Sequence, residues 1–270
     1  MTFANQLAEL GDFYVNDAFG AAHRNHTSTA KLAKVLKPAV SGLLMEKEIR
    51  CLSQALDNPT RPFTAVVGGA KVSSKIGVLE NLLDKVDSMI IGGGMAYTFV
   101  KANGGKIGNS ICEDDQIDVA KAIEKKAQEK GVKLVMATDV LVTDDFSGNG
   151  KNEFVKINEI PDGFEGVDAG PDSRKAFAEV LKSSKTILMN GPVGAFENPK
   201  FAEGTKAVLE AIVEATKAGA TSVIGGGDSV SAAKKFFKAE DFTHVSTGGG
   251  ASLEFIEGKV LPGVAALDDK

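Results

Sequence analysis

The 270-residue sequence lacks several features that mark common protein classes. Tryptophan is absent and aromatic residues make up only 6% of the chain, so a platform for stacking nucleic-acid bases is not expected. The two cysteines, Cys51 and Cys112, are too few for a disulfide framework and do not have the spacing of a metal site. No apolar run approaches the roughly 18 residues needed to span a bilayer, and the start MTFANQLAEL does not resemble a signal peptide. We therefore expect a cytoplasmic protein without membrane contact.

Positive charge is also scarce. The formal net charge is −5 and the isoelectric point is near 5.4, whereas nucleic acids and anionic membranes attract clustered positive charge. One local basic group, KKFFK at residues 234–238, is typical of a solvated helix face. Nucleic acid is therefore not an expected partner.

Short β-branched runs alternate with amphipathic segments over most of the chain. Strands are expected at 62–68, 87–94, 132–140, 185–191, 220–226 and 242–249, and helices at 71–85, 95–102, 115–131, 171–184, 199–219 and 229–238. This alternation predicts a doubly wound α/β fold, with a parallel sheet between two helix layers. Residues 141–166 interrupt the pattern and form either an antiparallel excursion or a surface loop.

The first forty residues differ from the remainder. They are polar and loop-like, with too few apolar residues to bury a core of their own. A helix expected at 41–57 leads from them to the turn sequence NPTRP. We interpret residues 1–40 as the end of another domain, residues 41–57 as a connector, and residues 58–258 as the main domain.

Glycine follows four of the expected strands, in GGAK (68–71), GGG (92–94), GGGD (225–228) and GGG (248–250). Glycine lets a phosphate approach the backbone, and the carboxyl ends of parallel strands meet at one edge of a sheet. A single glycine turn needs no ligand to explain it, but four at one edge favour a phosphate or nucleotide site. GxGxxG and GxxxxGK[ST] are both absent, which argues against a Rossmann dehydrogenase and a P-loop enzyme.

Charged residues beside these turns suggest their chemistry. Lys71 and Lys75 lie four apart at the expected start of a helix, where both side chains would point to one side and suit a polyphosphate. Asp228 is either a Mg²⁺ ligand or the N-cap of the following helix, and Ser229 is either a cap or a phosphate contact. Glu197 is either a ribose contact or a complement to a helix dipole, and Phe196 is a candidate apolar wall.

The loop DAFGAAHRNHTSTA contains His23, Arg24 and His26. Its histidines have no serine or cysteine partner motif, and their spacing does not suit zinc. An arginine in such a loop suits a phosphate or carboxylate, because the guanidinium can bind both oxygens.

Six motifs together resemble the phosphoglycerate kinase family: YVNDAFGAAHR (14–24), GGAKVSSKI (68–76), IIGGGMAYTF (90–99), NGPVGAFE (190–197), GGGDSV (225–230) and HVSTGGGASLEFIEGKVLPGV (244–264). The resemblance covers essentially the whole chain. It implies reversible, Mg²⁺-dependent phosphoryl transfer in glycolysis between 1,3-bisphosphoglycerate with ADP and 3-phosphoglycerate with ATP. It also implies a monomeric, two-domain kinase with nucleotide on the C-terminal domain, and a tail at residues 259–270 that returns toward the N-terminal domain.

The resemblance also implies roles for individual residues. Lys71 would stabilise the transferring group, with Gly248 and Gly249 at the helix start that meets it. Asp228 would bind Mg²⁺, and Arg24 would hold the phosphoglycerate. The nucleotide site would comprise Lys71, Lys75, Gly93, Gly94, Gly166, Asn190, Gly191, Phe196, Glu197, Gly226, Gly227, Asp228 and Ser229.

Three departures from the family pattern bear on activity. Most of the family's N-terminal domain would precede residue 1, Ser74 stands where many relatives have aspartate, and Ser229 where many have threonine. Two functions are therefore expected as alternatives: an active kinase, or an ADP- or ATP-binding module with little turnover. A Rossmann-type dehydrogenase is a third, weaker hypothesis.

Overall fold

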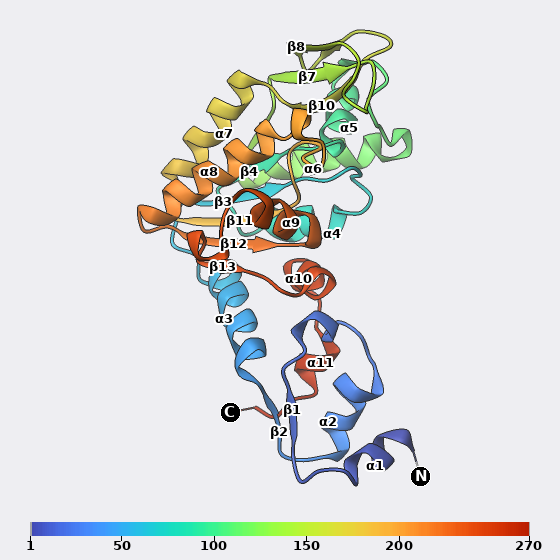
Figure 1. Cartoon of the computed structure of the whole chain (residues 1–270), viewed down its shortest axis with the longest axis vertical. Helices are drawn as coiled ribbons and strands as arrows, with labels where there is room; N and C mark the ends of the chain where they lie inside the picture. The colour runs from blue at the N-terminus through green and yellow to red at the C-terminus, as the bar shows by residue number, and fades with distance from the viewer. Residues whose placement is uncertain (1, 270) are drawn as a thin grey trace.

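The computed structural model describes residues 2–269 and is elongated (Figure 1). A large α/β body, which we call the sheet unit (residues 58–258), occupies one end. A smaller end unit (residues 2–41 and 262–269) occupies the other, and the helix α3 (Leu43–Asp57) joins them. No helix within residues 2–269 is long and apolar enough to cross a membrane.

A six-stranded parallel sheet forms the centre of the sheet unit, in the order β13-β12-β11-β3-β4-β6. Its strands are β3 (Phe63–Val67), β4 (Ser88–Ile91), β6 (Lys133–Met136), β11 (Thr186–Asn190), β12 (Thr221–Gly225) and β13 (His244–Val245). The chain adds strands in one direction from β3 to β6 and in the other from β11 to β13. Such a reversal leaves a crevice at the carboxyl ends of the adjacent strands β3 and β11.

Helices cover both faces of the sheet, because alternate residues of each buried strand point to opposite sides. Ala65 and Val67 of β3 belong to one core cluster, and Val66 belongs to the other. The first face is covered by α3, α4 (Ile76–Leu83), α5 (Met95–Ala102), α6 (Ile117–Lys130) and α10 (Gly249–Ile256). The second is covered by α7 (Pro171–Ser183), α8 (Glu203–Lys217) and α9 (Gly227–Phe236). The predicted doubly wound, three-layer fold is thus confirmed.

The interruption at residues 141–166 is an antiparallel excursion, which was one of the two expected alternatives. β7 (Asp139–Thr143) pairs with β8 (Asn152–Lys156) and with β10 (Glu165–Ala169). The short strands β5 (Lys106–Ile107) and β9 (Glu159–Ile160) pair beside this sheet. The excursion brings Gly166 of β10 toward the helix α5, where it helps to shape the site described below.

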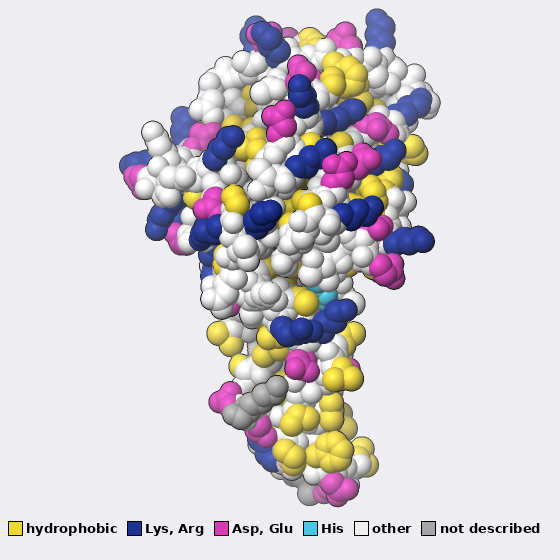
Figure 2. Space-filling view, turned by 90° about the vertical axis from the view of Figure 1, so that its left-hand side faces the viewer, with side chains coloured by type: hydrophobic (Ala, Val, Ile, Leu, Met, Phe, Trp, Pro, Cys, Tyr) yellow, Lys and Arg dark blue, Asp and Glu magenta, His cyan; other side chains and the backbone are white. Residues whose placement is uncertain are grey.

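The end unit is small and thinly packed. It contains α1 (Phe3–Ala8), α2 (Leu32–Val35), α11 (Pro262–Ala265) and two parallel strands, β1 (Tyr14–Asn16) and β2 (Ala39–Ser41). Its buried apolar cluster consists of Ala33, Ala39 and Ala266, with Tyr14 and Leu267 against it. Figure 2 shows hydrophobic side chains gathered on the surface at this end of the molecule. The end unit therefore buries only a small apolar cluster of its own.

Candidate functional site

Glycine turns leave the central strands at the same edge of the sheet. Asn190 is in register with Val67 on one side and with Gly225 on the other, so the loops after β3, β11 and β12 begin side by side. The loops after β3 and β11 cross in contact. A Cβ on Gly68 would lie 1.9 Å from Pro192 O, and one on Gly191, at φ +111°, would lie 2.0 Å from Gly68 O. Only glycine permits this crossing, because a side chain at either position would overlap backbone atoms.

A cavity of about 320 Å³ opens beside this crossing. Five residues predicted from the sequence line it: Gly93, Gly94, Gly166, Glu197 and Asp228. They come from three loops and from the antiparallel excursion. The strand ends thus form one concave site, in agreement with the placement expected for a parallel sheet.

The two lysines do not share a helical turn, which corrects the sequence prediction. α4 begins at Ile76, and Lys75 is its N-cap residue. Ser74 Oγ donates to Lys71 O at 2.9 Å, and Ser73 Oγ donates to Glu113 Oε1 at 2.6 Å. These side-chain bonds compete with helix formation, so the chain turns before the helix starts.

The lysines consequently have different surroundings. Lys71 is exposed, whereas Lys75 is partly buried and donates a hydrogen bond to Asn190 Oδ1. Burial lowers the pKa of Lys75, against the opposing effects of the Asp228 and Glu257 carboxylates. Lys75 therefore connects the loop after β3 to the end of β11, and Lys71 remains free to reach a ligand.

Asp228 lies at the start of α9 but does not cap it. The N-cap residue is Gly226, at φ +86°. The exposed Asp228 side chain forms no hydrogen bond or ion pair within residues 2–269, although its charge acts on Lys75. The cap interpretation is therefore wrong. A free carboxylate beside backbone amides fits Mg²⁺, which often takes one or two protein carboxylates and completes its shell with phosphates and water. No cluster of three or more His, Cys, Asp or Glu residues in the described part of the chain offers a denser metal site.

Ser229 and Phe196 are both turned away from the cavity. Ser229 is buried, and its hydroxyl accepts a hydrogen bond from Gly191 N at 2.5 Å. Phe196 is also buried and belongs to the core under α8 and α9, so it is not the apolar wall that the sequence suggested. Both residues fix the loops that carry the site.

Glu197 is exposed at the cavity, and α9 holds the loop that carries it. Lys235 Nζ donates to Phe196 O at 2.8 Å and to Glu197 O at 3.2 Å. It also lies 5.7 Å from the centre of the Phe196 ring. The sequence predicted a solvated basic face at KKFFK, but one of its lysines positions this loop.

The remaining predicted residues lie around the start of α10. Gly248 is its N-cap residue and packs against the Phe19 ring, so that a Cβ there would lie 2.4 Å from Phe19 Cδ1. A Cβ on Gly250 would lie 2.8 Å from His23 Nε2. The structure thus places the loop containing exposed Arg24 along the first turn of α10.

A buried carboxylate joins the connector helix to this turn. Glu48 of α3 accepts hydrogen bonds from the Thr247 backbone N–H at 2.6 Å and from the Thr247 hydroxyl at 2.7 Å. Its other oxygen lies 2.8 Å from His244 Nε2. Burial opposes the ionisation of Glu48, but these hydrogen bonds outweigh it and lower its pKa. The charge on Glu48 therefore fixes the loop immediately before Gly248.

Several lining residues were missed by the sequence analysis. Tyr97, Ile111, Phe146 and His23 lie at the cavity or at α10, and Phe146 is 55% exposed at the cavity wall. Phe146 lies in the excursion, where the pattern gave no prediction of its direction. The Phe146 ring lies 6.0 Å from the Phe201 ring between centres, and Asn198 Nδ2 donates to Phe146 O at 3.5 Å.

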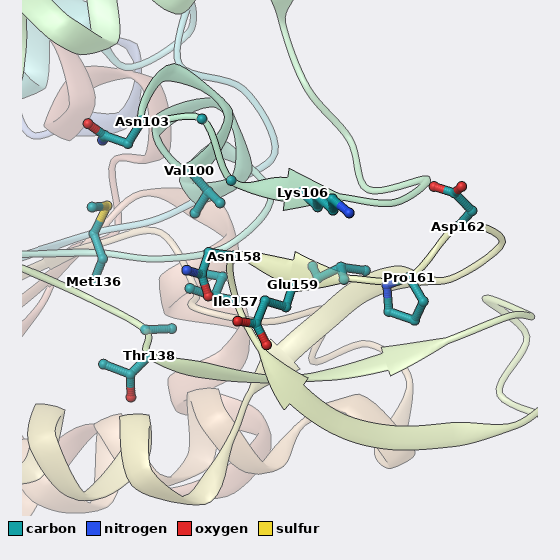
Figure 3. A pocket seen from close by; sticks show the side chains of 14 residues that line it. Val100, Asn103, Lys106, Met136, Thr138, Ile157, Asn158, Glu159, Pro161 and Asp162 are labelled. Carbon is teal, nitrogen blue, oxygen red and sulfur yellow. The ribbon is translucent and has the colours of Figure 1, made fainter.

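A larger cavity, of about 1030 Å³, lies elsewhere (Figure 3). It opens between the end of α5, β5, the end of β6 and residues 157–162, which include β9. Lys106 and Asp162 lie toward its rim, and none of the predicted site residues lines it. Size alone does not favour it, because the glycine turns and the free carboxylate converge on the smaller cavity.

Comparison with known proteins agrees with this geometry. The profile described as phosphoglycerate kinase matches residues 1–259. The chain belongs to the phosphoglycerate kinase family. A phosphoglycerate kinase of Nostoc punctiforme is 54% identical over 267 residues, which cover 99% of this chain and 67% of that protein.

Solved structures of the phosphoglycerate kinase family show the same fold. The structure of phosphoglycerate kinase from Coxiella burnetii matches with a TM-score of 0.93 and 45% identity, covering 97% of this chain and 67% of that one. Phosphoglycerate kinase from Pyrococcus horikoshii matches with a TM-score of 0.83 and 32% identity, covering 98% and 66%. The chain thus spans about two thirds of the length of these phosphoglycerate kinases, and the family resemblance inferred from its motifs is confirmed.

Proposed function

We propose that the strand-end cavity binds ADP or ATP with Mg²⁺. One observation carries this proposal: the glycine loops after β3, β4 and β12 meet at a cavity where Asp228 presents a carboxylate with no partner among residues 2–269. A carboxylate would repel bound phosphates unless a cation lay between them. The nucleotide's phosphates would lie toward Gly226, Gly227 and Asp228, and its base toward Gly93, Gly94 and Gly166.

Other residues have supporting roles in this proposal. Lys75, Asn190, Gly191, Ser229 and Phe196 hold the loops in place, through the contacts described above. Exposed Glu197 is positioned to accept from a ribose hydroxyl, and Lys71 to reach the phosphates. When bound, Mg²⁺ would neutralise part of the phosphate charge.

We further propose reversible phosphoryl transfer between 1,3-bisphosphoglycerate with ADP and 3-phosphoglycerate with ATP, as a cytoplasmic, monomeric enzyme of glycolysis. The phosphoglycerate would lie near Arg24, and the transferring group near Lys71 and the amides of Gly248 and Gly249. Phosphoryl transfer depends mainly on alignment and charge neutralisation, which amides, lysines and Mg²⁺ supply without a general base. α3, the connector, would act as the hinge that brings the two substrates together.

A second candidate function for these 270 residues is nucleotide binding with little turnover. Residues 1–40 contribute one arginine, Arg24, beside α10. An acyl phosphate carries several negative charges, and holding it in line takes more than one cation. A coupled assay for phosphoglycerate-dependent ATP turnover separates the two candidates, since turnover at ordinary kinase rates would exclude the second.

Calorimetric titration of the chain with ADP tests nucleotide binding. In Mg²⁺, Asp228→Asn should weaken ADP binding about 10–100-fold, the usual effect of disturbing a metal site. Without Mg²⁺, the variant should bind ADP at least as well as the wild type, because a repulsive charge is gone.

Asp172→Asn is a matched control, since Asp172 is also an exposed carboxylate in the first turn of a helix, α7. It should leave ADP affinity unchanged. No ADP binding by the wild-type chain would overturn the proposed function, and full Mg·ADP affinity in Asp228→Asn would remove Asp228 from the metal site.

A further inference from the structure

Tyr97 carries a hydroxyl group that the protein does not use. Its side chain is 4% exposed, and Tyr97 Oη has no hydrogen-bond partner anywhere in residues 2–269. The residue lies in the first turns of α5, directly after the glycine loop of β4, and its side chain lines the strand-end cavity. Tyr97 Oη is not one of the fully buried polar atoms without a partner, so the hydroxyl is unpaired but keeps access to the cavity, where a bound group can reach it.

The hydroxyl is fixed against Gly166. A Cβ on Gly166 would lie 2.0 Å from Tyr97 Oη and 2.3 Å from Cζ, so glycine is required where the ring meets β10. The rest of the ring is held among buried apolar residues, including Val100, Val140 and Ile157. The position of the hydroxyl is therefore set by packing and not by a hydrogen bond.

The cavity that Tyr97 lines has apolar walls in Ile111, Phe146 and Val167. The Glu165 carboxyl group also lines it and lies close enough to act on Tyr97, whereas exposed Asp228 belongs to the start of α9. An aromatic base fits between such walls, whereas phosphates fit the glycine turns. An unpaired hydroxyl beside such apolar walls suits one polar atom on the edge of a flat heterocycle.

The Tyr97 hydroxyl stays protonated and can therefore donate a hydrogen bond. Burial raises its pKa above the usual range, and the charges of Asp168 and Glu165 raise it further. The hydroxyl thus keeps its proton at every physiological pH. Purine rings present unprotonated nitrogens that accept such a hydrogen bond.

We propose that Tyr97 Oη donates a hydrogen bond to a ring nitrogen of the bound purine and thereby contributes to nucleobase selectivity. This inference rests on the proposed nucleotide site. A buried water is the competing partner, since a cavity of about 10 Å³ bordered by Tyr97 and Asp168 lies behind the ring. That volume is at the lower limit for one water molecule.

The experiment compares wild type and Tyr97→Phe in titrations with ADP, 1-deaza-ADP, 3-deaza-ADP and 7-deaza-ADP, each analogue lacking one ring acceptor. The wild type should bind one of the three analogues about 5–10-fold more weakly than ADP, the usual effect of losing one hydrogen bond. Tyr97→Phe should bind ADP about 5–10-fold more weakly and no longer distinguish ADP from that analogue. Its melting temperature should equal or exceed that of the wild type, since no protein hydrogen bond is lost.

Tyr14→Phe is the matched control, because Tyr14 is the other tyrosine of the chain and its hydroxyl donates to Ser28 O at 2.7 Å in the end unit. It should lower the melting temperature and leave all four affinities in their wild-type ratio. Equal ratios in wild type and Tyr97→Phe, with ADP bound by both, would overturn this inference alone and favour the water. Absence of ADP binding in the wild type would instead overturn the proposed function.

Discussion

The sheet unit and the end unit differ in how they are stabilised. In the sheet unit, every residue of β3 and β11 is buried between two helix layers. In the end unit, Leu10 is 82% exposed and Phe3 and Phe13 are each 61% exposed, while the buried apolar cluster consists of alanines. Apolar burial is the main favourable term in folding, so nearly all of it resides in the sheet unit.

The strand-end loops and the start of α10 are therefore held in place by different kinds of contact. The strand-end cavity, where we propose that nucleotide binds, is made of loops that leave a fully buried sheet, and glycine contacts hold these loops against one another. The α10 side, next to Arg24, depends on polar contacts such as Glu48 with Thr247 and His244. Substitutions in the two regions should therefore have effects of different size and kind.

The largest effect is expected at the loop crossing, with Gly191→Ala. The added Cβ would overlap Gly68 O and would also need a positive φ, so the free energy of unfolding should fall by about 3 kcal/mol or more. The variant should also lose ADP binding.

Gly219→Ala is the control, because Gly219 also has a positive φ, +95°, but open space around it. It should cost about 1 kcal/mol. Urea unfolding measures the stability of both variants. Similar losses of unfolding free energy would show that the positive φ, and not the overlap with Gly68 O, makes alanine unfavourable at position 191.

An intermediate effect on stability is expected for Glu48→Gln, which tests the polar contacts that hold the turn before α10. The variant weakens bonds to Thr247 and His244, so the free energy of unfolding at pH 7 should fall by about 2–3 kcal/mol. The folded state lowers the pKa of Glu48 from its ordinary value of 4.5. Its contribution is therefore present above that pH and is lost as the pH falls through the lowered value.

The difference between wild type and Glu48→Gln should accordingly shrink on acidification. Urea unfolding at a series of pH values measures it, with Glu210→Gln, an exposed carboxylate of α8, as the control that changes little. A difference that stays constant down to acid pH would show that packing, and not the carboxylate charge, explains the loss.

The smallest effect on stability is expected for the double variant Leu10→Ser and Phe13→Ser in the end unit. Both side chains are already mostly in solvent, so the free energy of unfolding should change by no more than about 0.5 kcal/mol. Sedimentation velocity should show no more self-association than in the wild type, because exposed apolar area decreases. A loss of several kcal/mol in urea unfolding would contradict the contrast between the two units.

Much of the sheet unit was predictable because its strands are buried runs and its helices are amphipathic. The glycine turns were predictable for a related reason, since parallel strands place all their carboxyl ends at one edge. The start of α4 was not, because Val72 continues the apolar spacing of the helix while Ser73 and Ser74 bond to Glu113 and to Lys71 O. Glu113 lies forty residues away, and no local pattern shows that it will be there.

The cavity residues from the antiparallel excursion were harder to predict than the glycine turns at the strand ends. Phe146 and Gly166 lie on the antiparallel excursion, whose short strands pair across long loops and leave only weak alternation. Ser229 and Phe196 had the right residue types for ligand contact, but burial turned them inward. Residue type thus suggested which side chains could contact a ligand, whereas the direction of each side chain depended on packing between distant segments.

Glu48 also has a mechanical consequence. α3 contains 15 residues, which corresponds to a rod about 22 Å long. Glu48 lies near the end of this rod that adjoins the end unit, and it grips the turn that precedes α10. One carboxylate therefore ties the orientation of α3 to the turn that carries Gly248 and Gly249.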